Sequence, residues 1–239
     1  MQVIVHGDDF GKDESVTRAI CMVMVRGWCD ETSLMVNMPY ADEAVRIARQ
    51  NGFSERVGLH LNLTEGVPLT EKILSCRRFC SANGLFNKKF HSGTLGRFFL
   101  SRDEAVAVKE EIEAQLSRFV SYEGLMMKID SHHHVHTDWA IYRILKPLAL
   151  KYGFRSMRIS ADCHRVGLLQ QLYKIFYNRD VRRHFETTDH FDGAMTICGE
   201  TEDCISEAMV HPMFVDGVLC DTSTPYERIA QSLNRKNND

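Results

Sequence analysis

The sequence predicts an α/β fold: a parallel β/α barrel that resembles a TIM barrel, incomplete or distorted, in a single domain covering residues 1–239. Short apolar runs alternate with helical patterns from the N-terminus onward, which is the order expected of strand–helix repeats around a parallel sheet. Polar residues follow several of these runs directly. The chain is long enough for one large α/β domain and contains no low-complexity linker.

The N-terminal part of the chain is predicted to contain three strands separated by two helices. Val16, Ile20, Val23 and Met24 follow helical spacing and form an apolar stripe. In chain order we expect a strand at 3–5, a helix through Val16 that ends at Gly27, a strand at 32–38, a helix from Pro39 to Asn51, and a strand at 56–63.

The segment 64–100 interrupts this pattern, because Gly, Pro, Ser and basic residues break every apolar run. We interpret it as a long insertion with short helices or turns. Ser101 and Glu104 then have the form of a capping box. After it we expect a helix through Phe119, a strand at 125–130, a helix over 139–152 that Pro147 kinks or shortens, strands at 156–160, 194–198 and 207–212, a polar helix at 164–182, and a helix from Pro225 that frays into the tail 234–239.

Composition excludes several classes of protein. The formal charge is −3 and the basic residues are scattered, so no extended positive surface for nucleic acid is expected. No apolar stretch approaches the length of a membrane span or a signal peptide, and we expect a cytoplasmic protein. The eight cysteines include no CxxC pair, and we expect free buried thiols.

Polar groups fall at the carboxyl ends of four predicted strands. Asp8 and Asp9 follow the first, His60 lies at the end of the third, and His132 and His211 each follow a later strand. In a parallel α/β fold these ends share one face, where such proteins carry out chemistry. One aspartate and two histidines from different strands suit a divalent cation with open positions, and the second aspartate can then act as a base.

The tract "SHHHVH" at 131–136 is the densest of these signals. At most one or two of its histidines can reach one metal ion, so we expect His134 and His136 to contact the substrate or to support the ligands. Taken singly, the aspartate pair has an alternative role as a helix cap or turn. His60 alone has the alternative of a core histidine in an apolar strand.

Four motifs together resemble one family of enzymes. They are "DDFG" near the N-terminus, "GLHLNLTEG" at 58–66, "DSHHHVH" at 130–136 and "HP" at 211–212, and they are similar in type and order to the YdjC-like carbohydrate deacetylases. The resemblance implies a TIM-barrel-like hydrolase with a divalent metal ion that removes acetyl groups from N-acetylated sugars.

The resemblance also implies roles for particular residues. Asp9, His60 and His132 correspond to metal ligands, Asp8 to the catalytic base, and His211 to a general acid or an oxyanion-stabilising group. Magnesium or zinc is expected as the single cation, with manganese or cobalt as alternatives. The expected partner is a small N-acetylated saccharide, and a homodimer is left open.

Two positions depart from the family pattern. His6 and Gly7 replace an Asn-Ala pair before "DDFG", and Met213 stands where glycine is expected after "HP". Neither change removes an expected ligand. A side chain at 213 could alter the loop beside His211, so this change is expected to affect turnover and the choice of substrate more than metal binding.

Two other functions compete with deacetylation. One is a different metal-dependent hydrolase such as a phosphoesterase, although two-metal phosphate chemistry usually needs more carboxylates than these motifs supply. The other is an inactive relative that binds a sugar or a metal. The retained Asp8 argues against that alternative, because metal binding alone does not require it.

Overall fold

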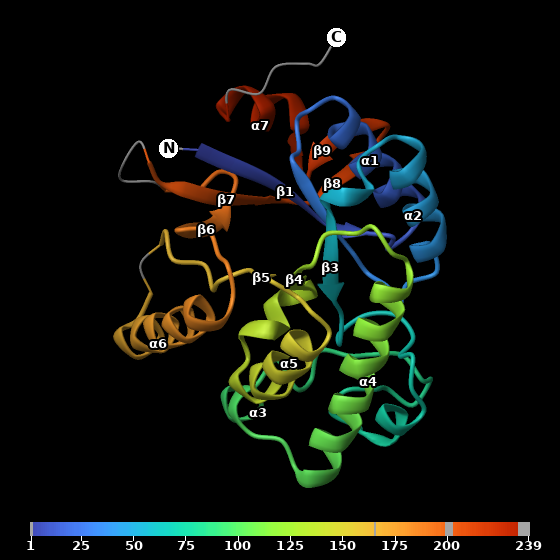
Figure 1. Cartoon of the computed structure of the whole chain (residues 1–239), viewed down its shortest axis with the longest axis vertical. Coiled ribbons are helices and arrows are strands. Elements are labelled where there is room, and N and C mark those ends of the chain that lie inside the picture. Colours follow the sequence, from blue (N-terminus) through green and yellow to red (C-terminus); the bar gives the residue numbers. More distant parts are fainter. Residues whose placement is uncertain (1, 165, 199–202, 234–239) are drawn as a thin grey trace.

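The computed structural model describes residues 2–164, 166–198 and 203–233, and its centre is a curled sheet of seven parallel strands (Figure 1). The strand order is β5-β4-β3-β2-β1-β7-β6. The seven strands are β1 (Gln2–Phe10), β2 (Glu31–Leu34), β3 (Val57–Leu61), β4 (Lys128–Ser131), β5 (Ser156–Met157), β6 (His190–Gly193) and β7 (Ile205–Val210). The curl gives a half-barrel whose sheet ends at β5 and β6, as the sequence predicts for an incomplete barrel. The β5 edge is lined by an isolated bridge from Ser156 to Glu186.

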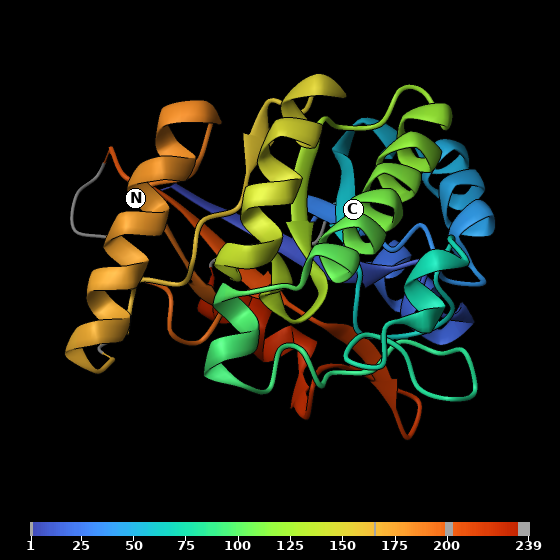
Figure 2. The same ribbon diagram turned by 90° about the horizontal axis from the view of Figure 1, so that it is seen from below.

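Helices cover the outer face of this sheet, and a small antiparallel sheet lies beside its C-terminal part (Figure 2). The longer helices are α1 (Glu14–Val25), α2 (Ala41–Gln50), α4 (Arg102–Ser121), α5 (Trp139–Lys151) and α6 (Leu168–His184). Shorter helical segments are η1 (Ser54–Arg56), η2 (Lys72–Ser75), α3 (Thr94–Phe98), η3 (His132–Thr137) and α7 (Tyr226–Ser232). The antiparallel sheet consists of β8 (Pro212–Val215), β9 (Val218–Asp221) and β10 (Thr224–Pro225).

Local sequence accounts for the helix boundaries. The capping box is formed, because Glu104 N donates to Ser101 Oγ and Ser101 N donates to the Glu104 carboxylate. Asp13 caps α1 in the same way through Val16 N. Pro147 lies inside α5, which continues to Lys151, so the helix predicted over 139–152 is confirmed and Pro147 does not shorten it.

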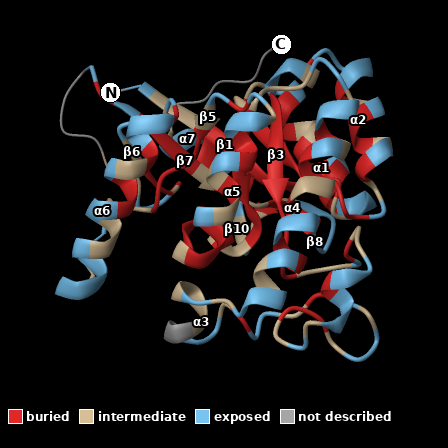
Figure 3. Cartoon of the chain, turned by 60° about the horizontal axis from the view of Figure 1, so that its bottom comes forward, coloured by how far each residue is buried: buried red, intermediate tan, exposed pale blue. Residues whose placement is uncertain are grey.

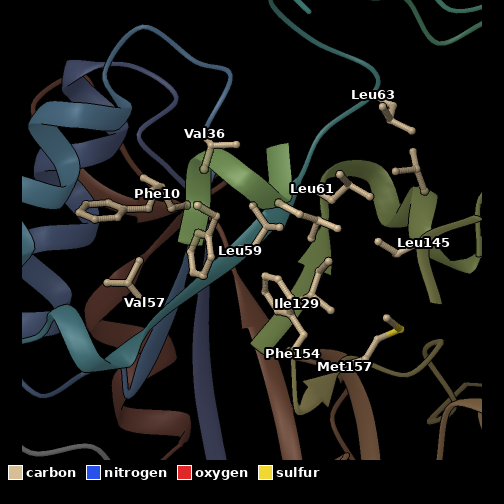
Figure 4. Packing of buried hydrophobic residues seen from close by; sticks show 14 of the residues in the cluster. Phe10, Val36, Val57, Leu59, Leu61, Leu63, Ile129, Leu145, Phe154 and Met157 are labelled. Carbon is tan, nitrogen blue, oxygen red and sulfur yellow. The ribbon is translucent and has the colours of Figure 1, made fainter. Parts of the chain in front are cut away.

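The two faces of the sheet carry different residues. Val57, Leu59 and Leu61 of β3 belong to one buried apolar cluster with Ile129 of β4 and Leu145 of α5, and Leu61 lies near Ile129 (Figure 4). Because strand side chains alternate, the residues between them face the interior of the half-barrel. Figure 3 shows the result, with buried strands at the centre and exposed residues on the outer helices.

Several predicted strands have different limits, and one is absent. Residues 194–198 form a turn and coil instead of a strand, since Thr196 N donates to Gly193 O immediately after β6. The preceding residues form β6 instead, although "HFDG" has little apolar alternation. The β8–β9 hairpin was not predicted, yet its Asp216-Gly217 turn, with both residues at positive φ, is a hairpin signal. The predicted tail 234–239 lies outside the described residues.

The cysteines correct another expectation. Cys163 and Cys198 form a disulfide across 35 positions of sequence, so the prediction of free thiols is wrong for this pair. Six other cysteines are free. Four of them are buried, as expected, namely Cys29, Cys80, Cys204 and Cys220, whereas Cys21 and Cys76 are only partly buried. Within the described part of the chain, every helix is too short or too polar to span a bilayer.

The core between β3 and the helices generates a stability prediction. Leu59 is fully buried, so Leu59→Ala should lower the free energy of unfolding by about 2–5 kcal/mol through lost burial and a residual cavity. Val106→Ala on the exposed face of α4 is the control, with an expected change within about 0.5 kcal/mol. Urea denaturation measures both variants, and equal losses would contradict this division between core and surface.

Candidate metal centre and active site

Three strand ends bring Asp9, His60 and His132 together in a buried cluster. Asp9 Oδ1 lies 3.2 Å from His60 Nε2 and 2.7 Å from His132 Nδ1. The ligand atoms of the three residues all lie within 4.8 Å of one another. The structure thus brings together the three residues that the sequence analysis groups as metal ligands.

The backbone of the first motif explains how Asp9 reaches this cluster. β1 pairs regularly with β2 up to Gly7, and the register then shifts before Phe10. Within that irregularity Asp9 has a φ of 76°, in the left-handed region that non-glycine residues seldom adopt. A regular strand would place Asp8 and Asp9 on opposite faces of the sheet. The positive φ of Asp9 redirects the backbone, so that Asp8 reaches Arg158 while Asp9 reaches the two histidines.

Each of the two histidines has a carboxylate on its other ring nitrogen. His60 Nδ1 lies 2.8 Å from Asp130 Oδ1, and His132 Nε2 lies 2.9 Å from Glu65 Oε2. Lys12 Nζ donates to the same Glu65 oxygen at 2.9 Å. A carboxylate in this position holds the imidazole in one tautomer and directs the opposite nitrogen, here His60 Nε2 or His132 Nδ1, at the cluster.

The histidine tract divides among several environments because its backbone turns sharply. His133 and His134 both have positive φ, at 52° and 55°, so successive rings point in different directions. His133 accepts a hydrogen bond from Lys88 Nζ at its Nε2 (2.8 Å) and contacts Thr64 Oγ1 through Nδ1 (2.9 Å). Only His132 of the tract joins the Asp9 cluster.

His134 and His136, the two expected substrate contacts, differ in their surroundings. His136 is fully buried, with Nδ1 2.5 Å from Ser131 Oγ and Nε2 3.1 Å from the Arg158 carbonyl oxygen. These contacts occupy both ring nitrogens and give His136 a structural position. The Nδ1 atom of His134 is buried without a hydrogen-bond partner among the described residues, which leaves His134 available for a ligand.

Asp8 is held by a fully buried arginine. Arg158 donates to both carboxylate oxygens of Asp8, at 2.9 and 2.8 Å, in a bidentate pair. The same guanidinium lies 2.7 Å from Asp130 Oδ2 and 2.5 Å from Glu207 Oε1. One cation therefore links Asp8 to the carboxylate that orients His60.

The charged interior continues beyond the Asp9 cluster. Lys128 Nζ donates to Glu31 at 2.7 Å and to Glu207 at 2.8 Å. His6, the departure from the family pattern, is fully buried between Ser33, Asp130 and Glu31. Its ring contacts lie 3.1–3.4 Å away, so His6 fills the space beneath the cluster without replacing a ligand.

Protonation in this site follows from burial and neighbouring charge. Burial disfavours the charged form of His60, but the Asp130 and Asp8 carboxylates raise its pKa to about 10. Burial also opposes ionisation of Asp9, yet the imidazoles of His132 and His60 hold its pKa far below the usual value. Burial lowers the pKa of His134 to about 4, so that ring is neutral near pH 7.

His211 lies at the end of β7, where its backbone N–H donates to Asp221 Oδ1 at 2.9 Å. Burial and the Arg158 charge lower the pKa of His134 most, and electrostatic repulsion from His211 is the smallest cause. Met213 follows in β8 and pairs with Cys220 of β9. The residue that departs from the family pattern is therefore part of a strand next to His211.

The cluster fits a divalent cation on its own geometry. Asp9 Oδ1 is buried among the described residues without a hydrogen bond of acceptable geometry, although two imidazole nitrogens lie close to it. One carboxylate oxygen and two imidazole nitrogens form a donor set typical of a catalytic metal site with open positions. Metal binding would displace the proton that the raised pKa of His60 otherwise keeps on that imidazole.

Sequence reasoning missed the residues that support the site. Arg158 stands alone in the apolar run "SMRIS", and a single charge in a buried strand is a signal for a buried partner. Asp130 and Glu65 lie inside the quoted motifs, but periodicity assigns them no partner. Lys128 lies between the apolar Met127 and Ile129, which could have indicated a charged inner face, whereas Glu207 follows Ser206 and gives no such signal.

The fold and the cluster define a class of protein: a half-barrel of parallel strands with a group of histidine and aspartate side chains, at the strand ends, that could hold a metal ion. More particularly, the chain belongs to the YdjC-like protein family, whose model matches residues 2–236.

Relatives with assigned names cover most of the chain. A carbohydrate deacetylase of Vibrio parahaemolyticus serotype O3:K6 is 29% identical over 228 residues, which cover 92% of this chain and 81% of the relative. A carbohydrate deacetylase of Geobacillus stearothermophilus is 29% identical over 232 residues, 96% of this chain and 86% of the relative. A crystal structure from Enterococcus faecalis V583, described as a cellobiose-phosphate cleavage protein, has the same fold, with a TM-score of 0.69 and 22% sequence identity. The match covers 98% of this chain and 95% of that protein's chain.

The charged interior generates a prediction about acid stability. Burial opposes ionisation of Glu31, but His6 and Lys128 lower its pKa from 4.5 to about 2. A lowered carboxyl pKa stabilises the folded state above about pH 4.5, and this contribution disappears as the pH falls toward 2. The difference in unfolding free energy between wild type and Glu31→Gln should therefore shrink over this interval, as measured by urea denaturation at several pH values. A difference independent of pH would contradict the assignment.

Proposed function

We propose that this protein is a metal-dependent carbohydrate deacetylase that hydrolyses the acetamide of an N-acetylated sugar and releases acetate. The observation that carries the proposal is the convergence of Asp9, His60 and His132 on one buried point. The names of the relatives support the sugar amide as the substrate class.

Asp9, His60 and His132 would hold the cation, with zinc or magnesium as the leading candidates and manganese or cobalt as alternatives. When bound, a divalent cation polarises the acetyl carbonyl and lowers the pKa of water at the site. Asp130 and Glu65 would keep both histidines oriented through the ring nitrogens that face away from the cluster.

Asp8 would accept the proton of the attacking water. Burial opposes its charge, but Arg158 lowers the pKa of Asp8, so the carboxylate is ionised at neutral pH. A carboxylate has about four lone-pair sites, and the two bonds from Arg158 leave capacity for a water molecule. Arg158 would also fix the direction of the Asp8 carboxylate, since a planar guanidinium binds it in two places.

His211 would donate a proton to the departing amine, and His134 would contact the substrate. The leaving sugar amine requires a proton at neutral pH, and a histidine at the end of β7 is chemically suited to supply it. His134 offers an Nδ1 atom that is buried without a hydrogen-bond partner among the described residues. We do not extend the substrate role to His136, because its contacts with Ser131 and Arg158 occupy the ring.

The alternatives have less support. The other acidic groups near the cluster already have cationic partners: Asp8, Asp130 and Glu207 bind Arg158, and Glu65 binds Lys12. They are therefore poorly suited to hold the second cation of a two-metal phosphoesterase. An inactive binding protein would have no use for the bidentate Arg158–Asp8 pair beside the cluster.

Acetate release tests the proposal directly. Protein stripped of metal and reconstituted with zinc, magnesium, manganese or cobalt should release acetate from N-acetylated sugars such as chitobiose only when metal is present. Asp8→Asn should lower turnover by about two to four orders of magnitude, the usual contribution of a general base, while metal stays bound.

Asp103→Asn, on the exposed first turn of α4, is the matched control and should retain wild-type turnover. Unchanged turnover in Asp8→Asn would remove Asp8 from the mechanism. Stoichiometric metal binding without acetate from any sugar would refute deacetylation of the tested class and favour a binding protein.

Glu65 generates a prediction that does not depend on turnover. Glu65→Ala removes the carboxylate from His132 Nε2 and should weaken metal binding by roughly 10–100-fold, as titration calorimetry would show. Glu65→Gln keeps an acceptor oxygen without the charge and should fall between Glu65→Ala and wild type. Glu71→Gln, an exposed change in the same insertion, serves as the control. Equal affinity in all variants would exclude a positioning role for Glu65.

A further inference from the structure

A second cluster of metal-ligating side chains lies between the two ends of the half-barrel sheet. β5 and β6 are the two edges of the seven-stranded sheet. The segment after β5 runs along β6 and pairs with it, since Asp162 N donates to Phe191 O and Phe191 N donates to Asp162 Oδ1, both at 3.1 Å. We call this contact the seam.

The cluster consists of Cys163 from the segment after β5, His190 from β6, and Cys198 from the segment after β6. The sulfur atoms and a His190 ring nitrogen lie within 4.8 Å of one another. All three residues are partly exposed, so solvent and ions can reach them. None of them belongs to the Asp9 cluster.

Two contacts prepare this cluster for a cation. His190 Nδ1 lies 3.3 Å from Asp162 Oδ2, which leaves Nε2 as the ring nitrogen free to ligate. Cys198 N donates to Cys163 Sγ at 3.0 Å, a contact that stabilises negative charge on that sulfur. An oriented histidine beside two sulfur atoms goes beyond what a disulfide alone requires.

We propose that the reduced form of Cys163 and Cys198, together with His190, binds a thiophilic divalent cation such as zinc. Two thiolates and one imidazole suit zinc, and water would complete a tetrahedral site. The disulfide in the structure is then the oxidised state of the same cluster. In both states the seam is cross-linked, by a covalent bond in one and by the cation in the other.

The exchange between these states balances with a dithiol as reductant. The dithiol gives two electrons and two protons, it is oxidised to its own disulfide, and the Cys163–Cys198 bond becomes two thiols. Binding of the cation then releases the two thiol protons, because cysteine ligates as the thiolate.

The position of the seam links this second site to the proposed active site. The Phe191 ring packs 4.7 Å from the Arg158 guanidinium and 5.7 Å from the His134 ring. Arg158 in turn binds Asp8. A cross-link that holds β6 against the segment after β5 therefore supports the surroundings of Arg158.

Cobalt spectroscopy separates this site from the Asp9 cluster, which contains no sulfur. The full chain is reduced with dithiothreitol, stripped of metal, freed of reductant under nitrogen and titrated with Co²⁺. We expect a thiolate-to-cobalt charge-transfer band in the near ultraviolet that Zn²⁺ abolishes. The band should disappear in Cys163→Ser and Cys198→Ser and persist in Cys21→Ser, whose thiol lies on α1.

His190→Gln provides a variant that keeps both thiols. It should weaken Co²⁺ binding at the sulfur site by at least about tenfold. His164→Gln is its control, because His164 follows Cys163 but bonds to Asp192 at 2.7 Å and lies outside the cluster. Far-ultraviolet circular dichroism verifies that each variant is folded.

Absence of the band in the reduced wild type would overturn the proposal and leave a disulfide only. Wild-type Co²⁺ affinity in folded His190→Gln would also overturn it, since His190 would then not be a ligand. The readout is independent of deacetylation, so failure of the proposed enzymatic function would not affect this result.

Discussion

The buried guanidinium of Arg158 is the interaction on which the site depends. It binds carboxylates from β1, β4 and β7, namely Asp8, Asp130 and Glu207. Its planar fork fixes Asp8 in two places, which an ammonium group could not do. Because Asp130 in turn orients His60, one cation controls both the expected base and an expected metal ligand. Without it, three buried carboxylates would lose a shared counter-charge.

A charged interior requires that stability come from elsewhere. The alternation of strand side chains places Val57, Leu59 and Leu61 against the helices while Gly58 and His60 face the interior. The apolar layer can therefore supply burial energy without contacting the reactive groups. The ion pairs of the inner layer add little net stability, because the desolvation of buried charges offsets much of their attraction. Their main effect is to hold the charged side chains in fixed orientations.

Backbone strain is concentrated at the same end of the sheet. Asp9, His133 and His134 all have positive φ, a conformation that costs non-glycine residues free energy. In return, adjacent side chains reach different targets: Asp8 meets Arg158 while Asp9 meets the histidines, and His132 joins the cluster while His133 meets Thr64. Regular strand geometry would not divide neighbouring residues in this way.

The sequence by itself determined the parallel β/α architecture, the long capped helix α4, and the strand-end position of Asp8, Asp9, His60 and His132, because periodicity, capping and strand-end position are local properties of the chain. The choice of Asp9 over Asp8 as the expected ligand came from the family resemblance. The sequence also contains the Asp216-Gly217 signal of the β8–β9 hairpin, which periodicity alone does not reveal. Only the tertiary structure decided which side chains contact one another. Arg158 and Asp8 are separated by 150 positions and His60 and Asp130 by 70, and the disulfide joins segments around an edge strand. Such pairings depend on the order and register of the strands, which no local pattern encodes.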